Sequence, residues 1–274
     1  MKRNELAVFF TCLSVLMLIL LCAPVFAYER IVSLAPAITE IIEDIGGSDK
    51  LVGVTDYCKP SSVIDCARVG GFLNPHLEAI MSLAPDMVII DKNSGTKYVA
   101  QKLAACQVPT TVVELYSLED LYAAYATIGA IVDQENAAQA RIEEFKTLCD
   151  RSRVNDEGMI LRVLFVRWHD PLTVAGRRSL EDTILTAIGA RNAITTSRTR
   201  YPVISIELIV QDPPDVIFDV SNYDQLDDCA RAQARERWRT WRAALCERGT
   251  RIFLFREDVH SVPGPRTRRF IEEL

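Results

Sequence analysis

The chain has 274 residues, of which 49% are hydrophobic and 25% are charged, so it has an ordinary globular composition and is long enough for two domains with cores of their own. This composition excludes an intrinsically disordered chain. The formal net charge of −6 disfavours nucleic-acid binding, because such proteins gain most of their affinity from Lys and Arg side chains that neutralise phosphates.

The N-terminus has the pattern of a secretory signal peptide over residues 1–27. Two basic residues precede an apolar stretch at 13–21, and a small-residue cleavage signal ends at Ala27. Two alternatives stay open: an uncleaved membrane anchor over residues 7–27, and a lipoprotein attached through Cys22. All three place the folded part of the chain in the periplasm or another extracytoplasmic compartment.

Residues 28–132 alternate predicted strands and helices, an order that favours a parallel sheet. A helix that starts near Thr39 ends at Gly46 and Gly47, which are typical of a helix C-terminus. We therefore expect an N-terminal α/β lobe. Its strands are predicted at 31–34, 51–54, 87–90 and 110–113, and its helices at 39–45, around Glu78 and at 100–105.

Residues 117–153 are rich in Ala and Glu, contain no proline and have apolar residues at helical spacing. A break at 129–133 divides them into a helix of the N-terminal lobe and a second helix of about twenty residues, or roughly 30 Å at 1.5 Å per residue. We expect this second helix, within residues 133–156, to form a single long backbone helix that joins the first lobe to another.

Residues 157–274 form the predicted C-terminal lobe, which begins with a strand and a helix as the first lobe does. A long helix at 228–245 carries several arginines on one side and Trp238 and Trp241 on the other, which is typical of an amphipathic helix packed on a core. A helix lying on a membrane surface is the alternative. The other elements of this lobe are strands at 161–166 and 216–218, and helices at 180–188 and around Glu207.

One pattern occurs twice in the chain: an aromatic residue, a glutamate six residues later, and then an aspartate that leads into an apolar run. Each anchor of the second copy lies 129 positions after its counterpart. In both copies the helix that carries the glutamate stops at proline, and the apolar run that follows is typical of a buried strand in a parallel sheet. The repeat indicates two similar, Rossmann-like α/β lobes. Its anchors are Phe72, Glu78 and Asp86 in the first copy and Tyr201, Glu207 and Asp215 in the second.

Six cysteines follow residue 27, and an oxidising compartment favours disulfides between them. Cys58 and Cys66 flank a short loop, and we expect this pair to be bonded. No Cys-x-x-Cys occurs, which disfavours a thioredoxin-like redox motif and a structural zinc site. A weaker candidate pair, Cys229 with Cys246, brackets the predicted helix at 228–245. The two remaining cysteines, Cys106 and Cys149, are interpreted as buried thiols.

The sequence lacks the common catalytic motifs, including Gly-x-Ser-x-Gly, His-Glu-x-x-His, a Walker loop and a dinucleotide fingerprint. We therefore expect no enzymatic activity and no catalytic cofactor, with an extracytoplasmic enzyme on a similar fold as the less favoured alternative. The three histidines, His76, His169 and His260, are expected on loops. If they converged with an acidic residue they would suit zinc or manganese, but lone histidines are more often solvated, and no metal site is assigned.

Several segments carry a resemblance to one family. They are 30–40, 52–60, 69–78, 84–90 and 201–207, followed by Gly-Pro-Arg at 264–266. Together they resemble the Fe/B12 periplasmic-binding family, the class III receptors of ABC transporters, whose members take up vitamin B12, hydroxamate siderophores or haem. The resemblance covers nearly all of residues 30–274. It implies two α/β lobes joined by one rigid helix, with the ligand in the cleft between them.

The resemblance also implies residues that contact the ligand. Tyr57 lies where the B12 receptors have a cleft tyrosine, and Arg266 resembles their second-lobe arginine. Phe72 and Tyr201 occupy the places of two cleft tryptophans, and a single phenyl or phenol ring suits a corrin less well than an indole. Trp168 follows the first strand of the second lobe, at an edge that opens onto a cleft, and is a further candidate. The alternatives are core packing for the aromatics and a surface salt bridge for the arginine.

The resemblance assigns Glu78 and Glu207 to contact with arginines on the two halves of a membrane permease. The alternative is a capping role, because a carboxylate in the first turn of a helix is favoured by the helix dipole. The implied protein is a monomeric substrate-binding protein that delivers a corrinoid (cobalamin) or an iron chelate (ferric siderophore or haem) to an ABC permease dimer with its cytoplasmic ATPase. A receptor for a bare metal ion remains the alternative.

Overall fold

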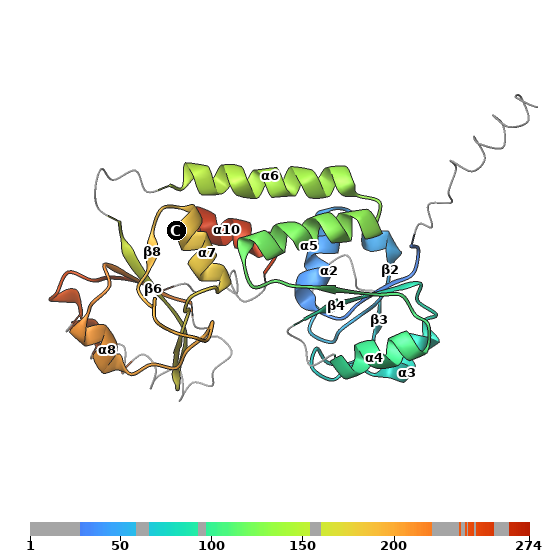
Figure 1. Cartoon of the computed structure of the whole chain (residues 1–274), viewed down its shortest axis with the longest axis horizontal. Coiled ribbons are helices and arrows are strands. Elements are labelled where there is room, and N and C mark those ends of the chain that lie inside the picture. Colours follow the sequence, from blue (N-terminus) through green and yellow to red (C-terminus); the bar gives the residue numbers. More distant parts are fainter. Residues whose placement is uncertain are drawn as a thin grey trace, which may run out of the picture.

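The computed structural model describes residues 28–58, 66–92, 97–153, 160–220, 236, 239, 241–243, 245–254 and 263–274. These residues form two α/β lobes that lie side by side, and helix α6 (Glu135–Arg151) runs across both (Figure 1). Each lobe is built on one five-stranded sheet. The predicted fold class, two lobes with parallel sheets joined by a single long helix, is confirmed, although one strand pair of the second sheet is antiparallel.

The N-terminal lobe has an all-parallel sheet in the order β3-β2-β1-β4-β5. Every residue of β4 is buried, because alternate side chains such as Val88 and Ile89 pack into different apolar clusters. Burial on both faces is why such strands are continuous apolar runs in the sequence. The strands are β1 (Ile31–Ser33), β2 (Leu51–Val54), β3 (Ala67–Arg68), β4 (Met87–Asp91) and β5 (Thr110–Val113), and the helices are α2 (Pro36–Asp44), η1 (Ser48–Lys50), α3 (Leu77–Ser82), α4 (Lys97–Ala105) and α5 (Leu118–Ile131).

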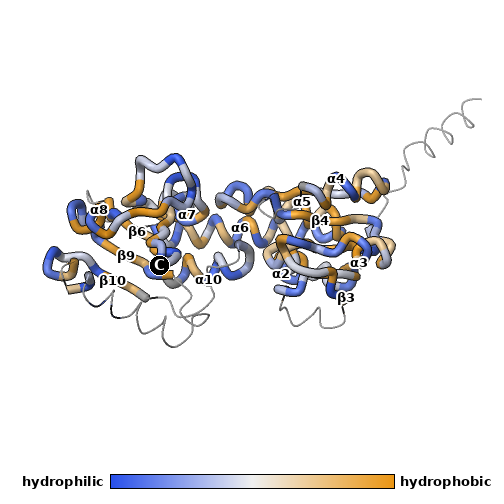
Figure 2. The backbone as a smooth tube through the Cα atoms, turned by 90° about the horizontal axis from the view of Figure 1, so that it is seen from below, coloured by the Kyte–Doolittle hydropathy of each residue, from blue (hydrophilic) through white to orange (hydrophobic). Residues whose placement is uncertain are grey.

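The C-terminal lobe has the strand order β10-β9-β6-β7, and β8 also pairs with β6. Only β7 is antiparallel to its neighbour; the other pairs are parallel. Figure 2 shows the hydrophobic residues concentrated along strands such as β4 and β9, in the middle of each lobe. The strands are β6 (Arg162–His169), β7 (Leu172–Val174), β8 (Arg191–Asn192), β9 (Val216–Asp219) and β10 (Arg251–Leu254), and the described helices are α7 (Leu180–Ala187), α8 (Ile206–Gln211) and α10 (Pro265–Glu273).

The repeated aspartates join neighbouring strands at the amino ends of both sheets. Asp86, just before β4, accepts hydrogen bonds from the backbone N–H groups of Glu29 (2.8 Å) and Arg30 (3.0 Å), just before β1. In the second lobe, Asp215 accepts a hydrogen bond from the N–H of Arg162, the first residue of β6, at 2.7 Å. Each aspartate therefore ties the strand that follows it to the strand beside it, which gives this position of the repeat a structural role in both lobes.

A shared interior joins the lobes. One apolar cluster is continuous from α2 of the N-terminal lobe through α5 and α6 to α7 and α10 of the C-terminal lobe. On α6, Phe145 is fully buried, and its ring centroid lies 5.8 Å from that of Tyr125 on α5. Beside this interior, Arg266 of α10 forms an ion pair with the buried Glu40 of α2, at an Nε–Oε2 distance of 3.0 Å.

A second polar contact lies at the end of α2. Asp44 accepts a hydrogen bond from the Tyr125 hydroxyl at 2.8 Å. The same carboxylate lies 3.3 Å from Nε of Arg141 on α6 and 3.6 Å from a terminal nitrogen of Arg268 on α10. Helices from both lobes and the bridging helix therefore meet around one carboxylate, which fixes the C-terminal helix against the N-terminal lobe.

Some elements differ from the sequence prediction. Helix α2 begins at Pro36, three residues earlier than expected, because proline is favoured in the first turn, where its missing N–H is not needed. Strand β6 continues to His169, and the two-residue turn of Asp170 and Pro171 reverses the chain into β7, a connection short enough only for an antiparallel pair. Elements η1, β3, β8, β10 and α10 were also not predicted.

Two predicted segments for which a membrane role was considered lie largely outside the described residues. These are the predicted signal peptide at 1–27 and most of the predicted helix at 228–245, of which the described residues, including 241–243, are helical. In the part of the chain that the structure describes, no helix combines the length and the apolar character needed to span a membrane.

Replacing Asp86 with Ala should lower the free energy of unfolding of the N-terminal lobe by about 1–2 kcal/mol, because two backbone N–H groups lose a charged acceptor. Asp215→Ala should have a smaller effect, since one such bond is lost. Urea unfolding followed by circular dichroism measures both. The control is Asp212→Ala, which removes only an exposed ion pair with Arg162 and should change stability by less than about 1 kcal/mol. Equal values for all three would contradict the strand-joining role.

The lobes should move little on ligand binding, because closing them would bend α6 and disrupt the shared interior, whereas a hinge of two or three extended strands would absorb such a motion. Small-angle scattering profiles of the ligand-free and ligand-bound protein should nearly superimpose. A clear fall in the radius of gyration on binding would argue for a hinge.

Candidate functional site

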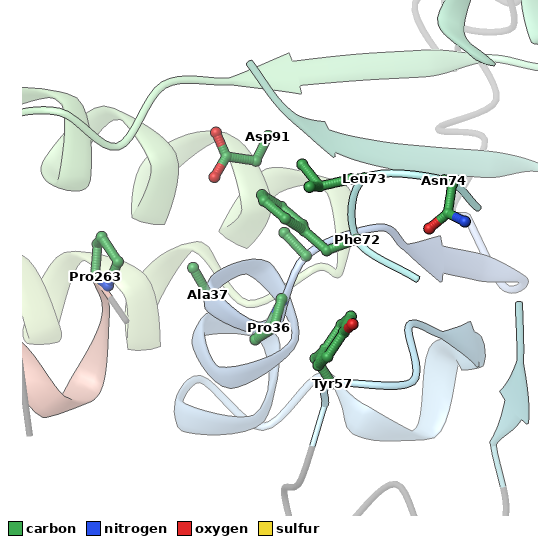
Figure 3. A pocket seen from close by; sticks show the side chains of 9 residues that line it. Pro36, Ala37, Tyr57, Phe72, Leu73, Asn74, Asp91 and Pro263 are labelled. Atoms are coloured by element: carbon green, nitrogen blue, oxygen red, sulfur yellow. The ribbon is translucent and has the colours of Figure 1, made fainter. Parts of the chain in front are cut away.

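A cavity of about 430 Å³ opens at the carboxyl ends of β1 and β4, the edge at which open parallel α/β sheets bind ligands. Figure 3 shows the side chains around it: Pro263 comes from the segment before α10, and the others come from the N-terminal lobe. The cavity is therefore mainly a feature of the first lobe, with one contribution from the second. Its lining consists of Ala35, Pro36, Ala37, Tyr57, Phe72, Leu73, Asn74, Asp91 and Pro263.

The loop at 70–75 presents two of these side chains. Gly70 and Pro75 pair as an antiparallel bridge that closes the loop. Gly70 has a φ of +95°, a backbone conformation that favours glycine. At the tip of the closed loop Leu73 is 68% exposed, and Phe72 beside it is half-buried. The loop thus places an aromatic ring and an aliphatic side chain at the cavity.

Tyr57 and Asp91 complete the chemistry of the cavity. Tyr57 lines the cavity and is 65% exposed, so its ring is accessible to a ligand. Asp91 is the last residue of β4, is buried, and supplies a carboxylate to a lining that is otherwise mostly apolar. The structure brings together Tyr57 and Phe72, two of the predicted site residues, in one cavity (Figure 3).

The two aromatics predicted from the second lobe do not line this cavity. Trp168 is 40% exposed, and its indole N–H donates to the carbonyl of Asp170 at 2.9 Å. Tyr201 is also 40% exposed, its hydroxyl lies 3.3 Å from a carboxylate oxygen of Glu181, and the Arg167 guanidinium lies 5.3 Å from its ring centroid. Burial and the nearby Glu181 raise the pKa of Tyr201, so its hydroxyl stays neutral at physiological pH.

Arg266 lies close to the cavity but is held by a carboxylate of the protein. It forms two hydrogen bonds to Glu40, from Nε at 3.0 Å and from Nη2 at 2.5 Å. Both partners follow a cavity-lining residue closely in sequence: Glu40 lies one helical turn after Ala37 on α2, and Arg266 is in the first turn of α10, just after Pro263. The predicted site arginine therefore also joins the two lobes next to the cavity.

Sequence reasoning identified two of the nine lining residues and missed the other seven, among them Leu73, Asp91 and Pro263. Asp91 had a usable signal, because it directly follows the apolar run at 87–90 and the carboxyl ends of parallel strands form the binding edge. Pro263 had none, because it reaches the first lobe only through the packing of α10 on α2. That packing is close: a Cβ at Gly264 would lie 3.7 Å from Cγ1 of Ile41.

The predicted disulfide between Cys58 and Cys66 is absent, and this prediction is corrected. Neither cysteine is disulfide-bonded, and their sulfurs have different contacts. The Cys58 sulfur is buried and lies 3.2 Å from the hydroxyls of both Thr39 and Thr55, whereas the Cys66 thiol donates to the carbonyl of Leu51 at 3.3 Å. Of the other predicted thiols, Cys149 is buried as expected, Cys106 is exposed, Cys246 is free, and Cys229 lies outside the described residues.

The histidines do not form a metal centre in the described part of the chain. His169 is not on a loop as predicted: it ends β6, is buried, and its Nε2 lies 3.0 Å from a carboxylate oxygen of Asp219. His76 precedes α3 and is exposed, and His260 lies outside the described residues. Among the described residues, no group of three or more His, Cys, Asp or Glu side chains is arranged to hold a metal ion.

Glu78 and Glu207 occupy equivalent positions, each the second residue of a six-residue helix, α3 and α8. Both are exposed. Figure 1 shows α3 and α8 on the same side of the molecule, one on each lobe, opposite α6. The backbone N–H of Glu207 and the hydroxyl of Ser205 lower the pKa of the Glu207 carboxyl, so it is ionised at neutral pH.

Comparison with known proteins identifies the family to which this chain belongs. The family model for periplasmic binding proteins matches residues 31–244, which include strands and helices of both lobes. The chain belongs to the periplasmic binding protein family.

Curated relatives extend over most of the chain. The vitamin B12-binding protein of Vibrio parahaemolyticus is 26% identical over 251 residues, which cover 90% of this chain and 88% of the relative. The vitamin B12-binding protein of Pectobacterium carotovorum is 25% identical over 215 residues, with 76% and 77% covered.

Solved structures show the same fold. The periplasmic vitamin B12 binding protein of Vibrio cholerae superposes with a TM-score of 0.71 at 24% identity, covering 90% of this chain and 94% of the other. The periplasmic haem binding protein of the same organism superposes with a TM-score of 0.75 at 23% identity, with 89% and 96% covered. Proteins with different ligands therefore share this two-lobed arrangement.

Proposed function

We propose that this protein is the extracytoplasmic substrate-binding protein of an ABC importer. It captures a corrinoid or an iron chelate between its lobes and hands it to a permease, and it catalyses no reaction. Membership of the periplasmic binding protein family supports the receptor role, and relatives named for vitamin B12 and structural neighbours named for haem support this range of ligands.

The observation that carries the proposal is the cavity at the carboxyl edge of the first sheet. Its volume of about 430 Å³ and mostly apolar lining suit a small-molecule site, with the rings of Tyr57 and Phe72 as stacking surfaces and Asp91 as the polar group. On the facing lobe, Trp168 and Tyr201 offer further partly exposed rings. We propose that a ligand with a large apolar surface bridges these groups.

Delivery requires a surface that a permease can contact on both lobes. Glu78 and Glu207 are exposed and lie on the same side of the molecule, which suits contact with the two halves of a permease dimer. In this proposal residues 1–27 act as a signal peptide cleaved after Ala27, and the mature protein works outside the cytoplasm as a monomer.

Phe72→Ala and Tyr201→Ala should each weaken binding of the cognate ligand by about 1–3 kcal/mol, the range for loss of a buried aromatic contact. Isothermal titration calorimetry with cyanocobalamin, haem and ferric hydroxamates measures the effect. The matched control is Tyr98→Ala, which removes an exposed ring on α4 that stacks with Lys102 outside the cavity. Unchanged affinity in both site variants would remove these aromatics from the site.

Charge reversal of both glutamates, Glu78→Arg with Glu207→Arg, should leave the melting temperature and ligand affinity nearly unchanged. It should lower permease binding and uptake more than tenfold through like-charge repulsion, about 1.4 kcal/mol or more. Pull-down with the permease in detergent and uptake by cells measure these effects.

The control for this variant is Glu135→Arg, which reverses an exposed glutamate in the first turn of α6, on the opposite side of the molecule. This substitution also replaces a favourable negative charge at a helix N-terminus with a positive one, but it leaves the proposed docking side intact. Full uptake by the double variant would exclude the two glutamates from docking. A lowered melting temperature with normal uptake would favour the capping role.

A further inference from the structure

Two loops of the second lobe meet at the boundary with the first. The loop at 176–179 and the loop at 197–201 are joined by a hydrogen bond from the N–H of Gly176 to the carbonyl of Arg200, at 2.7 Å. They lie beside the start of α5, where the N–H of Leu118 donates to the hydroxyl of Thr183 on α7 at 3.0 Å. This places the loops where the lobes face each other at the carboxyl ends of their strands.

Arg200 crosses this boundary. Its guanidinium carbon lies 3.8 Å from the ring centroid of Tyr116, which follows β5 of the N-terminal lobe. Its Nε donates to the carbonyl of Arg178 at 3.1 Å. Among the described residues, the two terminal nitrogens of Arg200 have no hydrogen-bond partner. The side chain is therefore held in one orientation by stacking and by one hydrogen bond, while no described residue accepts a hydrogen bond from its two terminal nitrogens.

The surroundings of Arg200 carry an excess of positive charge. Three carboxylates are nearby, but Glu181 pairs with Arg167 at 2.7 Å, and the other two accept backbone N–H groups: Asp182 that of Arg178 at 2.8 Å, and Asp120 that of Tyr116 at 3.2 Å. Arginines at close quarters repel each other, and an anion among them relieves that repulsion. The arginines of the two loops are Arg177, Arg178, Arg198 and Arg200.

We propose that Arg200, stacked on Tyr116, is an anion-binding residue that receives a carboxylate of the transported ligand and selects carboxylate-bearing metal chelates over neutral ones. A guanidinium binds a carboxylate through two parallel N–H donors, and a stacked guanidinium loses little entropy on binding because its orientation is already fixed. The inference deepens the proposed function and rests on it.

The other arginines at the cleft are less suited to this role. Arg266 has two hydrogen bonds to Glu40 of the protein itself, and Arg167 pairs with the buried Glu181. A ligand carboxylate would have to displace a protein carboxylate at either place. At Arg200 it meets donors that no described residue uses.

Haem and haem dimethyl ester test the proposal, because they share the apolar ring and differ only in their two carboxylates. The wild-type protein should bind haem at least about tenfold more tightly than the diester in absorbance titrations. Arg200→Ala should weaken haem binding by about ten- to a hundredfold, the range for a hydrogen bond to a charged group, and leave diester binding unchanged. Arg200→Lys should recover only part of the loss, because an ammonium lacks the planar fork.

Two controls separate the role of Arg200 from general effects. Arg191→Ala removes the same charge from an exposed side chain at the amino end of β6, where Arg191 pairs with Arg162, and should change haem affinity less than about twofold. Tyr116→Phe should bind haem normally because the ring remains, whereas Tyr116→Leu should weaken haem and not the diester.

Equal affinity for haem and its diester, or unchanged haem binding by Arg200→Ala, would overturn the anion site and leave the receptor role standing. If neither porphyrin binds, ferric citrate replaces haem as the carboxylate-bearing compound, and cyanocobalamin and a neutral ferric hydroxamate replace the diester as neutral compounds. Tighter binding of a neutral compound than of ferric citrate would likewise overturn the anion site. If no chelate binds, the proposed function fails. In that case metal-free citrate tests the anion site alone. The site is supported if citrate raises the melting temperature of the wild type and not that of Arg200→Ala, and it is overturned if citrate has no effect or the same effect on both.

Discussion

The arrangement of the whole molecule depends on the apolar interior that α2, α5, α6, α7 and α10 share. Phe145 of the bridging helix and Phe270 of the C-terminal helix belong to the same cluster as Ile38 of the first lobe. Burial of these apolar side chains away from water stabilises each lobe, and the same hydrophobic effect stabilises the orientation of one lobe relative to the other. The ion pair of Glu40 and Arg266 adds direction to that packing, because its planar geometry tolerates little rotation of α10 on α2.

A fixed orientation changes how such a receptor gains affinity. If the lobes move as little as predicted, ligand binding does not have to supply the free energy of a large domain closure, and the contacts themselves set the affinity. The two lobes contribute different chemistry: the first supplies a mostly apolar cavity with Tyr57 and Phe72, and the second supplies cations and partly exposed rings. A ligand that fits the proposed site has an apolar body and polar groups at one side.

Sequence reasoning identified the elements that have strong local patterns and missed those that depend on distant contacts. Continuous apolar runs and helix-ending prolines located β4, β9, α3 and α8, and the repeat located Asp86 and Asp215, whose common role is to join strands. Strand β7 has three residues and too short a pattern to predict. The pairing of Arg266 with Glu40 spans 226 positions and has no local signal, and Cys58 and Cys66 lie near each other in sequence while their sulfurs have separate partners.

The aspartates that join the strands lie at the amino ends of the sheets, and the cavity lies at the carboxyl ends. Side chains that keep the fold and side chains proposed to contact the ligand are thus separated by the length of a strand. Substitutions at the cavity edge leave the joining aspartates in place. A lineage can therefore exchange one cargo for another by a few changes at that edge without passing through an unstable intermediate, which gives a physical reason why receptors named for vitamin B12 and for haem keep one scaffold.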